Sequence, residues 1–248
     1  MSMRILAVTA MTIAMNLGAY ADPIRLESGA ARTHLLELFT SEGCSSCPPA
    51  DEWLSGLKDD PRLWREVVPV AFHVDYWDYI GWPDRFASPE FSDRQRSYAR
   101  RGYIKTVYTP GLVLGGKEWR SWFYSRRLKL DERADAGPLR IEIADGRASA
   151  AFLPAAATPK PAELNIAVLG FDLETPVKAG ENRGRTLKHD FVVLGYKRVS
   201  MEAGENGLRA VTKLPEPRFA SRITAVAAWV SGRGDPFPLQ AVGGWITR

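Results

Sequence analysis

Several signals coincide in one stretch of the sequence, Leu36-Glu-Leu-Phe-Thr-Ser-Glu-Gly-Cys44-Ser-Ser-Cys47-Pro-Pro-Ala-Asp51. An apolar run typical of a β-strand leads into a Cys-X-X-Cys pair. Two prolines follow at positions that suit the first turn of a helix, where an N–H group is dispensable. Outward from this stretch, strand-like runs cover 34–39, 67–74 and 106–114, and helix-like runs cover 47–58 and 88–101. This alternation predicts an α/β domain over residues 22–135.

The second half of the chain has a different character. Short strand-like runs cover 139–144, 148–153, 163–171, 186–199, 208–213, 223–231 and 239–247, with Gly, Asn and Asp between many of them. Short strands separated by turn residues are typical of a β-sandwich. We therefore expect an all-β, sandwich-like domain over residues 136–248. The Ala/Pro-rich stretch 154–161 is an alternative domain boundary.

Composition and the N-terminus limit the possible functions. The formal net charge is +4, from 33 Lys and Arg against 29 Asp and Glu, without a basic block, so nucleic acid is a poor candidate partner. Residues 1–21 combine a basic start, an apolar run and Ala19-Tyr-Ala21, which predicts a signal peptide cleaved after Ala21. We expect a secreted or periplasmic protein in an oxidising compartment, with no stable membrane insertion after cleavage.

Both cysteines of the chain lie in the one Cys-X-X-Cys pair. A disulfide across so short a loop stabilises a fold by only about 2 kcal/mol, which disfavours a purely structural role. Structural zinc needs four ligands, and no second Cys or His pair is suitably spaced. Redox chemistry fits best, with Cys44 as an exposed nucleophile at a helix N-terminus and Cys47 as the buried resolving thiol.

The dipeptide Thr109-Pro110 interrupts a run of strand residues about sixty positions after the cysteines. A proline cannot donate a hydrogen bond to a neighbouring strand. In a redox fold of this kind, we expect a cis peptide bond facing the cysteines, where Thr109 offers its backbone to an incoming peptide. The alternative is an ordinary edge-strand or turn proline, because most X–Pro bonds are trans.

At these residues the sequence resembles a bacterial family of secreted thioredoxin-like proteins catalogued as domain of unknown function 1223. The resemblance rests on the 36–51 stretch and on three further blocks, Phe72–Trp82, Ser92–Tyr98 with Tyr108-Thr-Pro110, and Gly180-Glu-Asn-Arg-Gly-Arg-Thr-Leu187. It covers essentially the whole mature chain and implies a thioredoxin-like fold for the first domain. Compared with the broader superfamily, Gly43 replaces an aromatic residue and Ser45-Ser46 replaces a Gly-Pro dipeptide. The direction of electron flow is therefore left open.

Four further features have both a functional and a structural interpretation. Glu37 could carry protons beneath the cysteines, but a structural hydrogen-bonded role is favoured. Asp51 is expected to be a solvated or capping acid. His73 and Asp75 share one face of a strand, and His73 could join Cys44 and Cys47 in binding Cu(I), although a core histidine is favoured. The aromatic residues of 76–103 could form a wall for a peptide substrate, and the arginines of 94–101 are expected on a solvated face.

Three function classes follow from these observations. The leading hypothesis is an exported thiol–disulfide oxidoreductase that acts on protein or peptide thiols, together with a redox partner protein and without a metal or organic cofactor. Cys44 and Cys47 would carry the catalysis, with Thr109 and Pro110 positioning the substrate. The alternatives are a periplasmic copper carrier that uses the two thiolates and His73, and a non-catalytic envelope binding protein.

Overall fold

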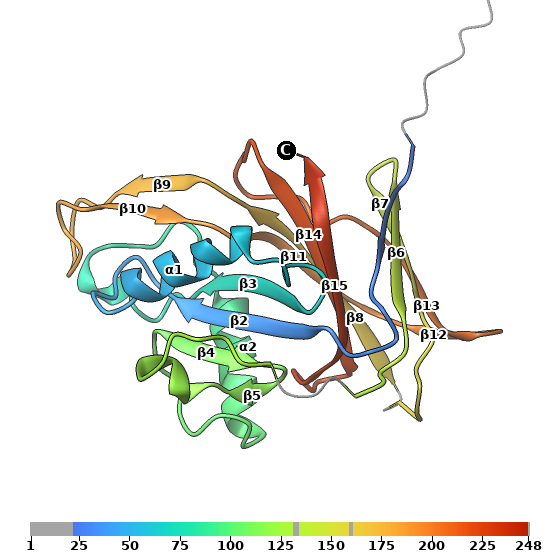
Figure 1. Ribbon diagram of the computed structural model, residues 1–248. Helices are drawn as coiled ribbons and strands as arrows, with labels where there is room; N and C mark the ends of the chain where they lie inside the picture. Colours follow the sequence, from blue (N-terminus) through green and yellow to red (C-terminus); the bar gives the residue numbers. More distant parts are fainter. Residues whose placement is uncertain (1–21, 131–133, 159–160, 248) are drawn as a thin grey trace, which may run out of the picture.

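The computed structural model describes residues 22–130, 134–158 and 161–247, so the predicted signal peptide lies outside the described residues. An eight-stranded sheet forms the centre of the molecule (Figure 1). Its strand order is β15 (Pro238–Thr247), β14 (Thr224–Gly232), β8 (Ala162–Gly170), β11 (Val192–Ser200), β3 (Val67–His73), β2 (His34–Thr40), β4 (Gly111–Leu114) and β5 (Lys117–Glu118). β2 and β3 are parallel, and β3 pairs in parallel with β11 at Ala71 and Val192.

A five-stranded sheet packs against one face of the large sheet. Its order is β1 (Ile24–Glu27), β6 (Leu139–Ala144), β7 (Arg147–Phe152), β13 (Gly207–Lys213) and β12 (Glu202–Gly204). β6 and β7 alternate between buried and exposed residues, as expected for a sheet with one solvated face. Their buried side chains share a core with one face of β8 and β14, through residues such as Ile166 and Val226.

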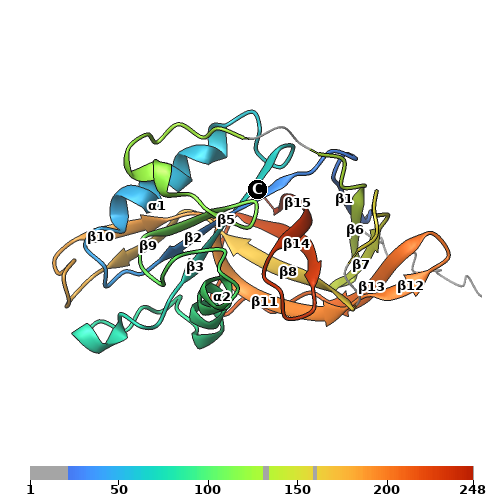
Figure 2. The same ribbon diagram turned by 90° about the horizontal axis from the view of Figure 1, so that it is seen from below.

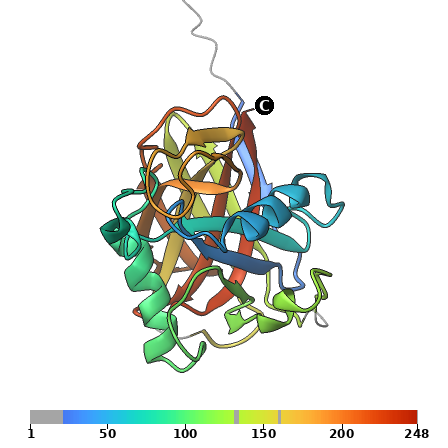
Figure 3. The ribbon, with the colours of Figure 1, turned by 90° about the vertical axis from the view of Figure 1, so that its left-hand side faces the viewer.

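Two α-helices, α1 (Pro48–Ser55) and α2 (Pro89–Arg100), lie on opposite faces of the β2–β3 part of the sheet (Figures 2 and 3). Both begin with proline at a position where a missing N–H group does no harm. Short 3-10 helices cover Gly56–Asp59, Asp78–Ile80 and Arg120–Phe123. Among the described residues, no helix has the length and apolar character needed to cross a membrane.

The predicted fold class, an α/β thioredoxin-like domain followed by an all-β sandwich-like domain, is wrong, although the two packed β-sheets fit the sandwich expected of the second half. The described residues contain two α-helices against fifteen strands, and strands from both sides of residue 135 hydrogen-bond within the eight-stranded sheet. The physical reason lies in β8 and β14, which are buried along almost their whole length. A strand in a free-standing two-layer sandwich has a solvated face, whereas these strands are covered on both faces. The division into residues 22–135 and 136–248 stays a prediction.

A separate two-stranded hairpin connects β8 to β11. It consists of β9 (Leu173–Pro176) and β10 (Thr186–His189), and it lies alongside α1 (Figure 1). Its connecting residues, 177–185, are called the hairpin loop below. The loop contains the Gly180–Gly184 block noted in the sequence, and through it the C-terminal half of the chain reaches the cysteines.

Candidate functional site

The two cysteines lie in the turn between β2 and α1 and are joined by a disulfide bond, with their Cα atoms 5.5 Å apart. β2 ends at Thr40, and Cys47 is the N-cap of α1. Cys44 therefore precedes the helix rather than lying in its first turn. The backbone N–H of Cys47 donates to the carbonyl of Cys44 at 3.2 Å, which closes the turn.

Neither cysteine is exposed. Cys44 and Cys47 both have 0% of their surface accessible, whereas Ser45 and Ser46 between them are exposed. The expectation of an exposed Cys44 over a buried Cys47 is wrong for this disulfide form. The reason is that segments distant in sequence cover the turn, and the adjacent residues could not reveal that cover.

Residues 77–82 form one side of this cover. A Cβ atom built on Gly43 would lie 3.1 Å from Ile80 Cδ1 and 3.3 Å from Trp77 Cβ, so a larger residue would crowd both side chains. The same Ile80 Cδ1 would lie 3.1 Å from a Cβ on Gly180 of the hairpin loop. Ile80 thus lies between Gly43 of the cysteine turn and Gly180 of the loop, and glycine at both positions leaves room for its side chain.

The hairpin loop forms the other side of the cover. Asn182 is fully buried, and its Nδ2 donates to the carbonyls of Glu42 and Cys44 at 2.8 and 3.0 Å. Arg185 Nη1 donates to Asn182 Oδ1 at 2.8 Å, which orients the amide toward these carbonyls. Next to Asn182, the exposed Glu181 accepts the backbone N–H of Ser45 at 3.0 Å.

The peptide bond between Thr109 and Pro110 is cis, as expected from the sequence. In the antiparallel pairing of β2 with β4, Phe39 lies opposite Gly111. Pro110 therefore lies beside the end of β2 from which the cysteine turn starts. Thr109 Oγ1 accepts a hydrogen bond from Trp77 Nε1 at 2.6 Å, and Trp77 also contacts Gly43. The structure thus places Thr109 and Pro110 near the cysteines, while their substrate-positioning role stays a prediction.

A group of buried ionisable side chains lies behind the cysteine turn. His73 Nδ1 is 2.6 Å from Asp84 Oδ2, and the same oxygen accepts the backbone N–H of Glu42 at 2.9 Å. His189 Nε2 lies 3.4 Å from Glu42 Oε1. The imidazole rings of His73 and His189 have centroids 4.9 Å apart. Burial alone would raise the pKa of Asp84, but His73 and the backbone donors outweigh it and hold that pKa below its ordinary value.

Asp51 belongs to the same buried group. It follows Cys47 by one turn of α1, and its Oδ2 accepts the hydroxyl of Thr40 at 3.0 Å. Burial raises its pKa from 3.8 to about 7, although His189 and the Thr40 hydrogen bond act in the opposite direction. The expectation of a solvated or capping acid is therefore wrong. Residues four apart on a helix share one face, so the position of Asp51 relative to Cys47 was the signal available in the sequence.

The structure gives no support to the copper hypothesis. His73 is engaged with Asp84, as a core histidine would be, and the two sulfurs are bonded to each other. Within the described ranges, no group of three or more His, Cys, Asp or Glu side chains has the arrangement to hold a metal ion.

A groove of about 650 Å³ separates α1 from the β9–β10 hairpin. Pro48, Asp51 and Lys58 line it from the N-terminal half of the chain, and Arg185 and His189 line it from the hairpin. The groove therefore starts one residue after Cys47 and reaches the buried acid. It connects the ionisable group behind the disulfide with the surface of the molecule.

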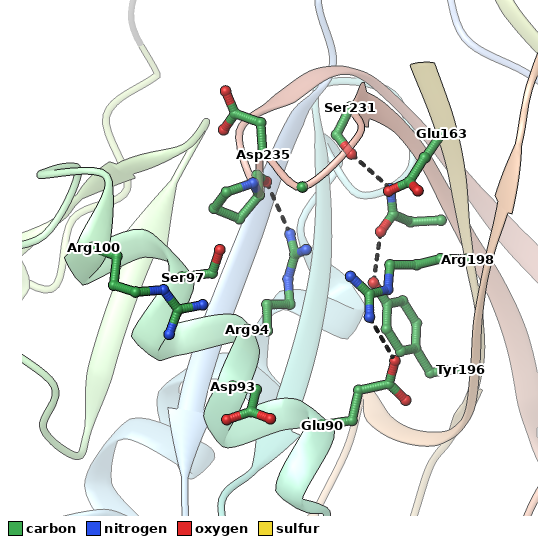
Figure 4. Close-up of a pocket in the computed structure, with 13 residues that line it drawn as sticks. Glu90, Asp93, Arg94, Ser97, Arg100, Glu163, Tyr196, Arg198, Ser231 and Asp235 are labelled. Atoms are coloured by element: carbon green, nitrogen blue, oxygen red, sulfur yellow. Dashed lines mark hydrogen bonds and ion pairs between the residues drawn. The ribbon is translucent and has the colours of Figure 1, made fainter. Parts of the chain in front are cut away.

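A second cavity, of about 340 Å³, lies between α2 and strands β8 and β11 (Figure 4). Several of its charged groups are paired, as in the 3.3 Å contact of Arg198 with Glu90. Arg94 is buried there, donates to the carbonyl of Pro236 and forms a 2.6 Å ion pair with Glu37 of β2. Glu37 is thus the structural residue expected from the sequence, whereas the expectation of a solvated Arg94 is wrong.

The aromatic residues of 76–103 divide between two locations. Phe86, Phe91 and Tyr98 are core residues. Trp77 and Trp82 are half-buried beside the cysteine turn, where Trp82 Nε1 donates to Glu42 Oε2 at 2.9 Å. The predicted aromatic wall is therefore limited to these two side chains and the neighbouring Tyr79, which is 83% exposed.

Sequence reasoning overlooked the residues that complete the site from a distance. Asp84 was not singled out, neither Glu42 nor His189 was assigned a part in this buried group, and the block at 180–187 was noted without a role. Its density of glycine and polar residues was a signal for a special turn, but its contact with residues 42–45 requires the tertiary structure.

Comparisons with known proteins give a family and a fold. The profile of a family described as "Protein of unknown function (DUF1223)" matches residues 35–231. A search of curated proteins finds no match. The crystal structure of protein AGR_C_4864 from Agrobacterium tumefaciens is similar with 26% identity and a TM-score of 0.58, over 86% of this chain and 94% of that chain. HBP35 of Porphyromonas gingivalis is 14% identical over 88% of this chain and 76% of that one, with a TM-score of 0.56, which indicates a shared fold alone.

Proposed function

The chain belongs to the DUF1223 family, and on that premise we propose that it is a thiol–disulfide oxidoreductase that exchanges its Cys44–Cys47 disulfide with protein or peptide thiols. One observation carries the proposal. The two cysteines form a disulfide at the start of α1, and a buried carboxyl group, Asp51, lies one turn further along with a pKa of about 7. A disulfide with a purely structural role has no use for a proton donor at this position.

The exchange proceeds in two steps. A substrate thiolate attacks the sulfur of Cys44, the bond between the two cysteines breaks, and the sulfur of Cys47 leaves with the electron pair and takes the proton of Asp51. A second substrate thiolate then attacks the substrate sulfur of the mixed disulfide and releases Cys44 as a thiolate. The substrate loses two electrons and the cysteine pair gains them. The reverse sequence reduces a substrate disulfide, with the Asp51 carboxylate accepting the proton of Cys47.

We further propose that the exchange takes place outside the cytoplasm. The apolar N-terminal segment supports export, and a disulfide inside the protein is favoured in an oxidising compartment. The half-buried Trp77 and Trp82 and the Thr109–Pro110 peptide are the groups nearest the turn that an extended peptide could contact.

The test is a redox equilibrium of the folded protein in glutathione buffers of increasing reducing power. The fraction of reduced pair is read by rapid acid quenching, thiol labelling and mass spectrometry. We expect a reversible two-electron transition with the fold retained by circular dichroism. Cys44→Ser combined with Cys47→Ser is the unlabelled control. A disulfide that is reduced only when the protein unfolds would overturn the proposal.

The complete burial of both sulfurs favours a second candidate, a binding protein in which the disulfide is structural. This candidate predicts resistance to reduction in the folded state and full biological function in the double serine variant. The glutathione titration therefore distinguishes the two candidates directly.

A further inference from the structure

We propose that Glu181 is a positioning residue for the cysteine pair: its carboxylate takes the backbone N–H of Ser45 and thereby disfavours the thiolate of Cys44. The inference rests on the proposed function, because it concerns the reduced state of the same pair. It assigns a chemical role to the Gly180–Gly184 block, which the exchange reaction itself leaves unused.

Glu181 is held in place by its neighbours. Asn182 is fully buried and binds the carbonyls on both sides of Gly43, those of Glu42 and Cys44. Gly180 has a φ of +72°, a conformation that glycine adopts readily, and a Cβ atom there would lie 3.1 Å from Ile80 Cδ1. These contacts fix the hairpin loop against the cysteine turn, so the exposed Glu181 is directed at Ser45 by buried groups rather than by its own packing.

Backbone N–H groups near Cys44 are scarce. A thiolate at the start of a helix is normally stabilised by free N–H groups of the first turn. Here Pro48 and Pro49 have no N–H, and the N–H groups of Cys47 and Ala50 donate to the carbonyls of Cys44 and Cys47. The N–H of Ser45, the residue directly after Cys44, is committed to Glu181 Oε2 at 3.0 Å. Glu181 therefore withdraws the Ser45 N–H from the thiolate, whereas the Ser46 hydroxyl, 3.3 Å from Cys44 Sγ, stays beside the sulfur.

The charge of Glu181 acts in the same direction. Ser45 holds the pKa of the Glu181 carboxyl below its ordinary value, so the carboxylate is ionised at neutral pH. The Glu181 carboxylate is bound to Ser45, the residue directly after Cys44, and its negative charge disfavours a second negative charge on the Cys44 sulfur. Reduction of the pair by two electrons yields one thiol and one thiolate with one proton, or two thiols with two protons. Destabilising the thiolate therefore shifts the pair toward the disulfide at pH values where Cys44 would ionise.

The experiment compares Glu181→Gln with Glu174→Gln in the full mature chain. Glu174 is an exposed residue of the same hairpin that pairs with Lys188, so its substitution removes an equal charge without touching Ser45. The fully reduced proteins are titrated with alkali, and thiolate formation is followed by its ultraviolet absorbance. This readout does not require a reagent to reach the buried sulfur.

We expect the first thiolate of Glu181→Gln to form about half a pH unit lower than in the wild type, which is about threefold more thiolate at a given pH below the midpoint. The equilibrium with glutathione should shift toward the reduced form by a similar factor. This shift should appear only at pH values above the midpoint of the thiolate titration. The difference should shrink at high salt, because Glu181 is exposed and its field is screened.

If the contact of Glu181 with Ser45 only holds the loop in place, Glu181→Gln should leave the thiolate titration unchanged. An unchanged thiolate titration in Glu181→Gln, an equal shift in Glu174→Gln, or a shift that is independent of both pH and salt would overturn the proposal. The thiolate titration needs only the reduced protein, so it can succeed even if the folded pair never exchanges with glutathione. Failure of this inference and failure of the proposed oxidoreductase function are therefore distinguishable.

Discussion

Replacing Asp51 with Asn should make the protein more stable at alkaline pH and should leave it almost unchanged in acid. Burial raises the pKa of Asp51 from 3.8 to about 7, so the folded protein binds this proton more tightly than the unfolded chain does. Stability from this group is fully present below the unfolded pKa and is lost as the pH rises toward the folded pKa. Over that interval of about three pH units, the wild type loses at most about 4 kcal/mol.

The Asn variant removes this loss. Its amide is similar in shape to a protonated carboxyl group and can still accept the hydroxyl of Thr40, as Asp51 Oδ2 does. Urea unfolding of the disulfide form at about pH 5 and about pH 8 gives the four free energies of unfolding needed for the comparison. We expect the variant to gain up to about 4 kcal/mol relative to the wild type at the higher pH and about 1.5 kcal/mol at the lower one, because about pH 5 already lies above the pKa of the unfolded chain.

Glu52→Gln is the matched control. Glu52 follows Asp51 on α1 but is exposed, so its substitution changes the net charge equally and should leave the pH dependence of stability as in the wild type. The reasoning fails if Asp51→Asn differs from the wild type by the same amount at both pH values. It fails equally if nuclear magnetic resonance shows the Asp51 carboxyl titrating near its ordinary range.

Three further outcomes are expected. Arg94→Met should destabilise the protein by about 3–5 kcal/mol because it leaves Glu37 buried without its ion pair, and the double variant with Glu37→Gln should recover part of this in urea unfolding; equal stability of the single and double variants would contradict this. Gly137→Ala should lower the free energy of unfolding by about 3 kcal/mol, because Gly137 has a φ of +82° and a Cβ there would collide with the carbonyl of Leu153. An unchanged melting temperature would refute this expectation. Asn182→Ala should speed iodoacetamide labelling of the reduced cysteines, measured by mass spectrometry, because the hairpin loop loses its attachment to the turn; equal rates would show that the loop does not limit access.

Local patterns predicted the individual elements well. The predicted strand at 34–39 and helix at 88–101 correspond to β2 at His34–Thr40 and α2 at Pro89–Arg100, because apolar runs and proline at helix starts are properties of neighbouring residues. β9 was not predicted, since Leu173–Pro176 alternates buried and exposed residues over too short a length to stand out. The predicted run 186–199 is two strands, β10 and β11, separated at Phe191, which has a φ of +58°.

The layer arrangement was beyond these patterns, although part of the signal was present. Ala225 and Val226 are neighbours on β14, yet they belong to different cores on opposite faces of the sheet. A strand buried on both faces must lie between two other layers, so the apolar run at 223–231 argued against a sandwich with a solvated outer surface. The choice of those layers depends on pairings such as Ala71 with Val192, which no local pattern encodes.

The candidate site divides in the same way. Cys44, Cys47 and the cis bond before Pro110 followed from motif and spacing. The burial of Cys44 and of Asp51 did not, because residues from the hairpin contribute to both environments. His189, for example, lies close enough to lower the pKa of Asp51 although 138 positions separate them in the chain.

The attachment of Asn182 to Cys44 has a consequence for the order of folding. The contact joins residues 138 positions apart, and closing so long a loop is slow compared with forming a helix or a hairpin. During synthesis the cysteines emerge long before the residues that bury them. Early in folding, the turn at Cys44 is therefore accessible to solvent and to other thiols. It becomes buried only when the segment that includes β8 and β11 has joined the sheet.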